Sequence, residues 1–306
     1  MLLKVLGSAA GGGVPQWNCS CPNCRSARAG NGIVRIRMNN SLAISADGET
    51  WYLINATPDV CAQIESHPEL YAGPQLRSTP VCGILLTDAE LDHTIGLLSL
   101  RQSSELAVYA AAPVLNALTG AFPVRQIIAP YATFHWAEIR PGESFPLFGE
   151  RLSVYPFLLG RKPPRYAARA DNSGPAAADD PWVVGYRFTD RLTGGVAVYA
   201  PGVESWTQEL ERQLQDADCI LIDGTFWHAD ELRDLGASEL DAAAMGHVPI
   251  SGPNGSLRRL AELPARRKVY THINNTNPIL HPESSEHRLL SESGIEVGCD
   301  GLELEV

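Results

Sequence analysis

The apolar positions of the chain fall into short runs that alternate with longer amphipathic segments. Short runs rich in Val, Ile and Leu, bounded by Gly, Pro, Asn or Asp, are typical of β-strands. This pattern predicts strands at 2–6, 41–45, 51–54, 81–86, 107–110, 152–157, 183–188, 196–199, 219–222 and 268–271. Apolar positions spaced about 3.6 residues apart predict helices at 59–65, 92–101, 113–118, 205–217, 256–263 and 286–293. Strands therefore alternate with helices in both halves, which indicates an α/β architecture in which helices cover sheets.

Ionisable side chains follow three of the predicted strands, at the point where each strand ends. The stretch "TDAELDH" at 87–93 comes after one strand, Asp223 after a second and His272 after a third. A further imidazole, His247, lies in the loop "MGHVPIS". Because the carboxyl ends of strands in layered α/β folds meet at one edge of the sheet, we expect these groups to lie close together.

Three carboxyl groups and an imidazole stand within six residues, at Asp88, Glu90, Asp92 and His93. Each buried charge without a partner costs several kcal/mol, so a cluster of this kind needs solvent, basic partners or a metal to compensate it. A divalent metal held by these residues together with those of the other strand ends satisfies this requirement. The sequence therefore predicts a metal site dominated by oxygen donors.

Composition and charge narrow the class of protein. A hydrophobic fraction of 44% and a charged fraction of 19% are those of an ordinary globular protein with a sizeable core. The net charge of −11, from 24 Lys and Arg against 35 Asp and Glu, argues against nucleic acid or an anionic membrane as a partner. No apolar stretch is long enough to span a bilayer. The first apolar run, residues 2–6, contains Lys4, so we interpret it as a strand and not as a secretory signal. A cytoplasmic protein is expected.

Three of the seven cysteines stand together in "CSCPNC", as Cys19, Cys21 and Cys24. Tight C-x-C and C-x-x-C spacings supply thiolates to a tetrahedral zinc ion from one loop, so we expect a structural zinc site within residues 17–25. The fourth ligand is not readable from the spacing, and His272 is one candidate. The other four cysteines, Cys61, Cys82, Cys219 and Cys299, are interpreted as small core residues.

Residues 160–181 differ in composition from the rest of the chain, with many Pro and Ala residues and a group of cations. We expect a flexible insertion within a single domain of residues 1–306, because strands resume on both sides. One interpretation is a solvent-exposed surface loop with no further role. The other is a mobile cover whose cations bind an anionic substrate. The candidate substrate-binding residues are Arg161, Lys162, Arg165 and Arg169.

The stretch "TDAELDHTIGLL" resembles the metal-binding motif T-H-x-H-x-D-H-x-x-G-L of the metallo-β-lactamase superfamily. Asp88 and Glu90 stand where that family has its two histidines, whereas Asp92 and His93 match. "LIDGTFW", "MGHVPIS" and "YTHINN" resemble later motifs, so the resemblance covers essentially the whole chain. It implies an αβ/βα sandwich of two mixed β-sheets flanked by helices, with a metal site along one edge.

Within the superfamily, the combination of "WNCSCPNC", "TDAELDH" and "THINNTNPIL" resembles members that act in the biosynthesis of pyrroloquinoline quinone (PQQ). The resemblance implies an iron-dependent enzyme that hydroxylates the tyrosine ring of a Glu–Tyr-derived precursor with dioxygen. Two other functions stay open: a non-catalytic carrier of PQQ or its precursor, and a metal-dependent hydrolase or phosphodiesterase. Association into a homodimer also stays open.

Asp92, His93 and His272 would form a two-histidine, one-carboxylate face, which suits non-haem Fe²⁺. Replacing imidazoles by carboxylates hardens the site and shifts its preference from zinc toward iron, manganese or magnesium. The alternatives to Fe²⁺ are Mn²⁺, Mg²⁺ or Zn²⁺. Asp88 and Glu90 would bind the metal weakly or support its ligands.

Four further residues complete the candidate catalytic set. His247 would orient the substrate or move a proton, since imidazole titrates near neutral pH. Asp223 is placed at the end of its strand to join the same site, and Asn274 and Asn275 would donate hydrogen bonds to substrate.

Overall fold

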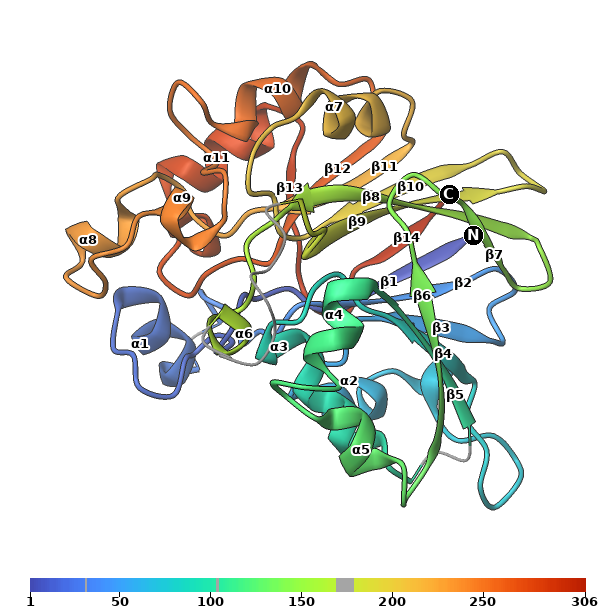
Figure 1. Ribbon diagram of the computed structural model, residues 1–306. Coiled ribbons are helices and arrows are strands. Elements are labelled where there is room, and N and C mark those ends of the chain that lie inside the picture. Colours follow the sequence, from blue (N-terminus) through green and yellow to red (C-terminus); the bar gives the residue numbers. More distant parts are fainter. Residues whose placement is uncertain (31, 103–104, 169–178) are drawn as a thin grey trace.

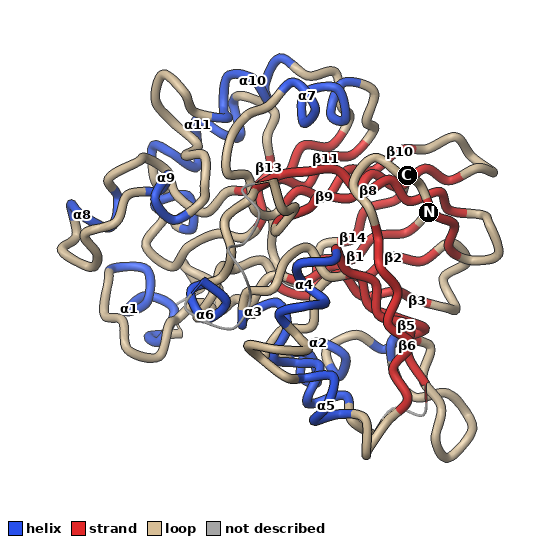
Figure 2. The backbone as a smooth tube through the Cα atoms, viewed as in Figure 1, coloured by secondary structure: helices blue, strands red, loops and turns tan. Residues whose placement is uncertain are grey.

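The computed structural model describes residues 1–30, 32–102, 105–168 and 179–306. Two seven-stranded mixed sheets face each other, and helices cover the outer face of each (Figures 1 and 2). The strand orders are β14-β1-β2-β3-β4-β5-β6 and β13-β12-β11-β10-β9-β8-β7. The expected αβ/βα sandwich is therefore confirmed.

The first sheet comprises β1 (Leu2–Gly7), β2 (Ser41–Ser45), β3 (Trp51–Ile54), β4 (Val81–Leu85), β5 (Glu105–Ala111), β6 (Thr133–Ile139) and β14 (Glu303–Glu305). Its strands from β3 to β6 run parallel, and β14, β1, β2 and β3 pair antiparallel. The segments between the parallel strands form α2 (Val60–Glu65), α3 (Leu91–Thr94), α4 (Ala112–Ala117), α5 (Val124–Ile128) and the 3₁₀ helices η1 (Pro68–Leu70) and η2 (Ile95–Leu100).

The second sheet comprises β7 (Phe145–Leu147), β8 (Leu152–Gly160), β9 (Val183–Asp190), β10 (Val196–Ala200), β11 (Cys219–Asp223), β12 (Arg267–Thr271) and β13 (Glu296–Val297). Strands β10 to β13 are parallel to one another. Their outer face carries α7 (Gln208–Gln215), α10 (Ser256–Glu262) and α11 (Ser285–Glu292) (Figure 1). The remaining short elements are α1 (Pro22–Ala29), α6 (Arg165–Ala168), α8 (Glu231–Asp234), α9 (Ala242–Met245) and η3 (Pro278–Leu280).

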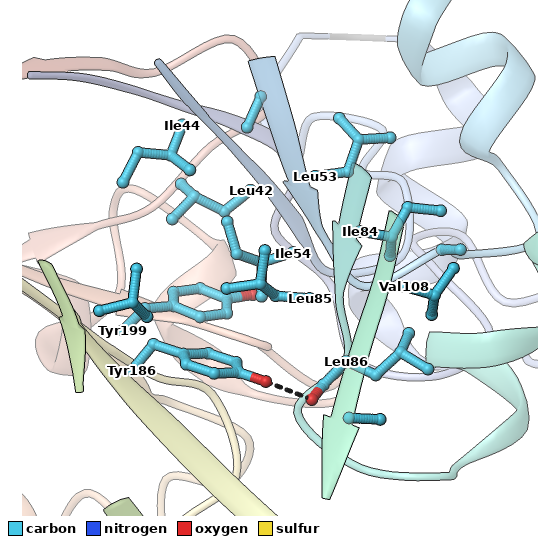
Figure 3. Close-up of a cluster of buried hydrophobic side chains, with 14 of the residues drawn as sticks. Leu42, Ile44, Leu53, Ile54, Ile84, Leu85, Leu86, Val108, Tyr186 and Tyr199 are labelled. Carbon is cyan, nitrogen blue, oxygen red and sulfur yellow. Dashed lines mark hydrogen bonds between the residues drawn. The ribbon is translucent and has the colours of Figure 1, made fainter. Parts of the chain in front are cut away.

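The main core lies between the sheets and is built from the inward-facing residues of their central strands. Figure 3 shows Leu42, Ile54 and Leu85 of the first sheet packed against Tyr186 and Tyr199 of the second. Tyr186 is fully buried, and its hydroxyl donates to the carbonyl of Leu86 at 2.6 Å. Because Leu86 directly follows β4, this bond fixes the start of the polar stretch at 87–93 against the opposite sheet.

Several elements differ from the sequence-based expectation. The helix expected at 92–101 is divided into α3 and the 3₁₀ helix η2. The division falls between Thr94 and Ile95, next to Gly96, whose amide donates to the carbonyl of Ala56 at 2.9 Å and where a Cβ would lie 2.0 Å from the carbonyl oxygen of Thr57. Of the cysteines expected in the core, Cys219 is buried, whereas Cys61 and Cys82 are exposed. Strands β6, β7, β13 and β14 were not predicted. β6 lacks a regular alternation of buried and exposed positions, and the other three are very short.

The loops that carry α1, α6, α8 and α9 gather at one end of the sandwich, and the two termini lie at the other end (Figure 1). The segment expected as a flexible insertion at 160–181 begins within β8 and contains α6, and its residues 169–178 lie outside the described part of the chain. Among the described residues, no helix combines the length and apolarity needed to cross a bilayer.

Candidate metal centre

The chain after β4 is held tightly before the candidate ligands begin. The amide of Thr87 donates to Asn55 Oδ1 at 2.9 Å, its hydroxyl oxygen lies 3.1 Å from the same atom, and its carbonyl accepts from the Val184 amide at 2.8 Å. Asn55 adopts a φ of 70°, a left-handed conformation that Asn tolerates better than most residues. The position of α3, and with it of Asp92 and His93, is therefore fixed from both sheets.

Asp92, His93 and His272 come together in space, as expected. Asp92 Oδ2 lies 3.7 Å from His93 Nε2 and 3.8 Å from His272 Nε2, and the two imidazole rings meet edge to face with centroids 5.3 Å apart. Two ligands of one tetrahedral ion, each about 2.1 Å from it, would be about 3.4 Å apart. The three donor atoms therefore already have nearly the spacing that a shared metal ion requires.

The chemistry of the donors also fits a metal. His93 Nε2 is buried and has no hydrogen-bond partner among the described residues. An unpaired buried nitrogen costs about 1–3 kcal/mol, and a metal ion at the centre of the three donors would satisfy it. His272 has a φ of 54°, which costs a non-glycine residue about 1–2 kcal/mol, and strain of this kind is often kept at functional sites.

The Nδ1 atom of each cavity histidine faces a protein acceptor. His93 Nδ1 lies 2.7 Å from Asp88 Oδ2, His247 Nδ1 lies 2.7 Å from Asp223 Oδ2, and His272 Nδ1 lies 2.8 Å from the hydroxyl of Thr225. Such partners fix the ring orientation and leave Nε2 for the metal or substrate. Asp88 thus supports a candidate ligand, and His247 and Asp223 form a hydrogen-bonded pair.

The charges of the cluster are strongly coupled. Burial disfavours a charged imidazole, but Asp88 and Asp92 outweigh it and raise the pKa of His93 to about 9. Burial likewise opposes ionisation of Asp92, yet His93 and His272 hold its pKa well below the usual range. For Glu90, burial and then the charges of Asp88 and Asp92 raise the pKa to about 7. In the absence of metal, protons therefore compensate part of the negative charge.

A cavity of about 420 Å³ opens onto these residues. Its polar lining adds Glu90, Lys162, Arg165, Glu204 and Asn274, and its apolar wall is formed by Val183, Phe226, Leu240 and Met245. Lys162 and Arg165 thus reach the site as expected. The Arg161 guanidinium instead contacts Asp179, and Arg169 lies outside the described residues.

Sequence reasoning overlooked Thr225, Phe226 and Glu204 as lining residues. Thr225 and Phe226 belong to the motif "LIDGTFW", so their distance of two and three residues from Asp223 was a readable signal. No local pattern in the sequence pointed to Glu204, because the fold of the loop after β10 is what brings it to the cavity.

The three clustered thiols also meet in space. The sulfur atoms of Cys19, Cys21 and Cys24 all lie within 4.8 Å of one another, as a shared metal ion requires. Burial raises the pKa of the Cys24 thiol to about 11, so a thiolate there needs a cation to stabilise it.

Asn275 lies at this thiol cluster and does not line the cavity, which corrects its expected role toward substrate. The Nδ2 nitrogen of its side-chain amide donates to the sulfurs of Cys19, Cys21 and Cys24, at 3.1, 3.5 and 3.3 Å. Asn275 therefore stabilises thiolates at this cluster, while His272 belongs to the group of Asp92 and His93.

Comparison with known proteins gives a consistent result. Residues 50–273 match the model of the beta-lactamase superfamily domain. Coenzyme PQQ synthesis protein B of Cupriavidus taiwanensis is 42% identical over 311 residues, covering 99% of this chain and 98% of that protein. The protein of the same name from Methylococcus capsulatus is 41% identical, covering 99% of both chains. The crystal structure of Zn²⁺-bound PqqB from Methylobacterium extorquens superimposes with a TM-score of 0.90 at 35% identity, and the match covers 100% of both chains.

Proposed function

The chain belongs to the coenzyme PQQ synthesis protein B family of the beta-lactamase superfamily, and on that premise we propose that it is an iron-dependent hydroxylase of PQQ biosynthesis. Its substrate would be the tyrosine ring of the Glu–Tyr-derived precursor, with dioxygen as co-substrate. The observation that carries this proposal is the group of Asp92, His93 and His272, whose donors have the identities and spacing of a two-histidine, one-carboxylate site.

An Fe²⁺ ion bound by these three residues would supply open coordination positions and redox chemistry toward dioxygen. The protein's own contribution is to orient the ligands. Asp88 holds His93 through Nδ1, and the burial of Asp88 keeps this bond away from bulk water. Replacing histidines by Asp88 and Glu90 removes the neutral ligands that a second zinc ion would use, which argues against the hydrolase alternative.

The cavity lining supports a polar aromatic substrate. Lys162 and Arg165 supply positive charge for carboxylates, and Phe226 and Val183 supply an apolar surface for a ring. His247 lines the same cavity and is held through Nδ1 by Asp223, so its Nε2 is free to accept a phenolic proton. Asn274 would donate a hydrogen bond to substrate.

The thiol cluster would hold a separate structural zinc ion through Cys19, Cys21 and Cys24, with Asn275 Nδ2 donating hydrogen bonds to the thiolates. Thiolates are soft ligands and prefer zinc to the harder cation of the cavity, so the two sites would take different metals.

The test combines metal analysis with turnover of the precursor. Hydroxylation of a phenol by dioxygen places one oxygen atom on the ring and releases the other as water, so the assay needs a two-electron reductant such as ascorbate. We expect Fe²⁺-loaded protein to consume dioxygen and to add one oxygen atom to the Glu–Tyr-derived precursor. Zinc-dependent phosphodiester turnover would instead support the hydrolase, and tight PQQ binding without turnover would support the carrier.

Two variants assign the metal. Asp92→Ala and His93→Ala should lose the cavity metal while they retain the zinc bound by the thiols. Full metal content in both variants would contradict the assignment.

A further inference from the structure

Beyond the predicted ligands, the hydroxyl of Thr225 stands at the centre of the polar network behind the cavity. Thr225 is only 3% exposed. Its Oγ1 lies 2.7 Å from Asp223 Oδ1, 2.8 Å from His272 Nδ1 and 3.2 Å from His247 Nδ1. It also lies 2.8 Å from the carbonyl oxygen of His272. One hydroxyl group therefore contacts both cavity histidines of the second sheet and the carboxylate between them.

The backbone holds this hydroxyl in place. Gly224 allows β11 and β12 to approach closely, since a Cβ there would lie 2.8 Å from the Tyr270 side chain. The carbonyl of Thr225 accepts from the Asn274 amide at 3.1 Å and from Asn277 Nδ2 at 3.3 Å. Thr225 is thus fixed on both sides before any ligand binds.

A hydroxyl group carries one proton, so its neighbours compete for it. A hydrogen bond to an ionised carboxylate is roughly twice as strong as one between neutral groups, and Asp223 therefore receives the Thr225 proton. The oxygen of Thr225 is then an acceptor for His272, which must carry its own proton on Nδ1. The other oxygen of the same carboxylate faces His247, whose Nδ1 donates to Asp223 Oδ2 at 2.7 Å.

We propose that Thr225 is a positioning residue that sets the tautomer of His272, so that its ring presents an unprotonated Nε2 to the cavity. His272 then offers this lone pair to the metal. This inference rests on the proposed function only for the purpose of the lone pair; the tautomer itself is a property of the protein without metal.

The test compares Thr225→Val, which removes the hydroxyl at nearly constant volume, with Thr225→Ser, which keeps it. The matched control is Thr57→Val, which removes an equally buried hydroxyl that donates to Gln63 Oε1 at 2.9 Å. Affinity for Co²⁺ is measured by competition after zinc has filled the thiol site. The absence of a cobalt–thiolate absorption band shows that cobalt has not entered that site.

We expect Thr225→Val to lower Co²⁺ affinity about 10- to 100-fold and to change the ligand-field spectrum, as loss of a residue that orients a metal ligand typically does. Thr225→Ser and Thr57→Val should keep the wild-type affinity and spectrum. Wild-type affinity in Thr225→Val would overturn the proposal. So would equal losses in the Ser and Val variants, or an equal loss in Thr57→Val. If Thr225→Val does not fold, Thr225→Ala removes the same hydroxyl.

A second readout separates this proposal from the proposed function. Ring ¹⁵N chemical shifts in metal-free protein report which nitrogen of each histidine carries the proton. We expect the Nδ1–H form for His272 in the wild type and a shift of His272 toward the Nε2–H form in Thr225→Val. An unchanged His272 tautomer would overturn the role of Thr225. A wild type that shows this tautomer but binds no Co²⁺ in the cavity would count against the proposed function alone.

Discussion

Replacing Asp88 by Asn tests how the buried carboxylate supports His93. Asp88 Oδ2 accepts from His93 Nδ1 and from the Thr87 hydroxyl, each at 2.7 Å, and Oδ1 accepts from the Glu90 amide at 2.9 Å. Asn has the same shape but no charge, and its NH₂ group must face one of these donors. The substitution therefore weakens the support of His93 without opening a large cavity.

Two effects of Asp88→Asn on metal affinity oppose each other. Loss of a carboxylate that orients a ligating histidine costs about 10- to 100-fold in affinity. However, the pKa of His93 is raised to about 9 in the free protein, so at pH 7 the metal must displace a proton at a cost of about 3 kcal/mol, or about 100-fold. Asp88 is the main group that raises this pKa, and Asn lowers it. The variant should therefore approach the wild type near pH 7 and fall well below it near pH 9.

The assay is a competition titration of Zn²⁺ or Co²⁺ against a chelator of known pH dependence, from about pH 6.5 to about pH 9. Wild-type affinity should rise about tenfold per pH unit in this range, whereas the variant's should rise less. Asp59→Asn is the control, because the partners of Asp59 Oδ2 in the described part of the chain are the amide and side chain of Asn39, at 2.8 and 2.6 Å. An affinity difference between the wild type and Asp88→Asn that stays constant across this pH range would contradict the prediction.

Three further predictions concern stability. Gly96→Ala should lower the free energy of unfolding, measured in urea titrations, by about 3 kcal/mol or more, because the added Cβ would lie 2.0 Å from a backbone oxygen. Gly120→Ala is the control and should lower it far less, because the nearest atom to its Cβ lies at 3.4 Å. Equal losses in the two variants would contradict this prediction. Cys21→Ser should lose the zinc of the thiol site and lower the melting temperature while cavity metal affinity changes little; unchanged melting would mean that no zinc stabilises this loop. Burial raises the pKa of Glu231 from 4.5 to about 7, so its contribution to stability is fully present below about pH 4.5 and is lost as the pH rises through about 7. Glu231→Gln should flatten the fall of the unfolding free energy between these pH values, and parallel wild-type and variant curves would count against this.

The sequence by itself determined the layered fold and most of the candidate ligands. An apolar run that ends in Asp, Glu or His marks the end of a buried strand, because only a site that compensates charge keeps such groups there, so the residues at the ends of β4, β11 and β12 could be placed at one edge. Local spacing was equally sufficient for the thiols, because Cys19, Cys21 and Cys24 lie in a single turn of chain and need no distant partner to meet.

Only the tertiary structure decided which polar residue faces which neighbour. Asn274 and Asn275 are adjacent in sequence, yet one lines the cavity and the other lies among the thiols, because the chain turns after Asn274, whose carbonyl accepts from the Asn277 amide at 3.0 Å. The role of Thr225 is likewise absent from any local pattern. It depends on the close approach of β11 and β12 at Gly224, which brings Thr225 and His272, residues far apart in the chain, within one hydrogen bond of each other.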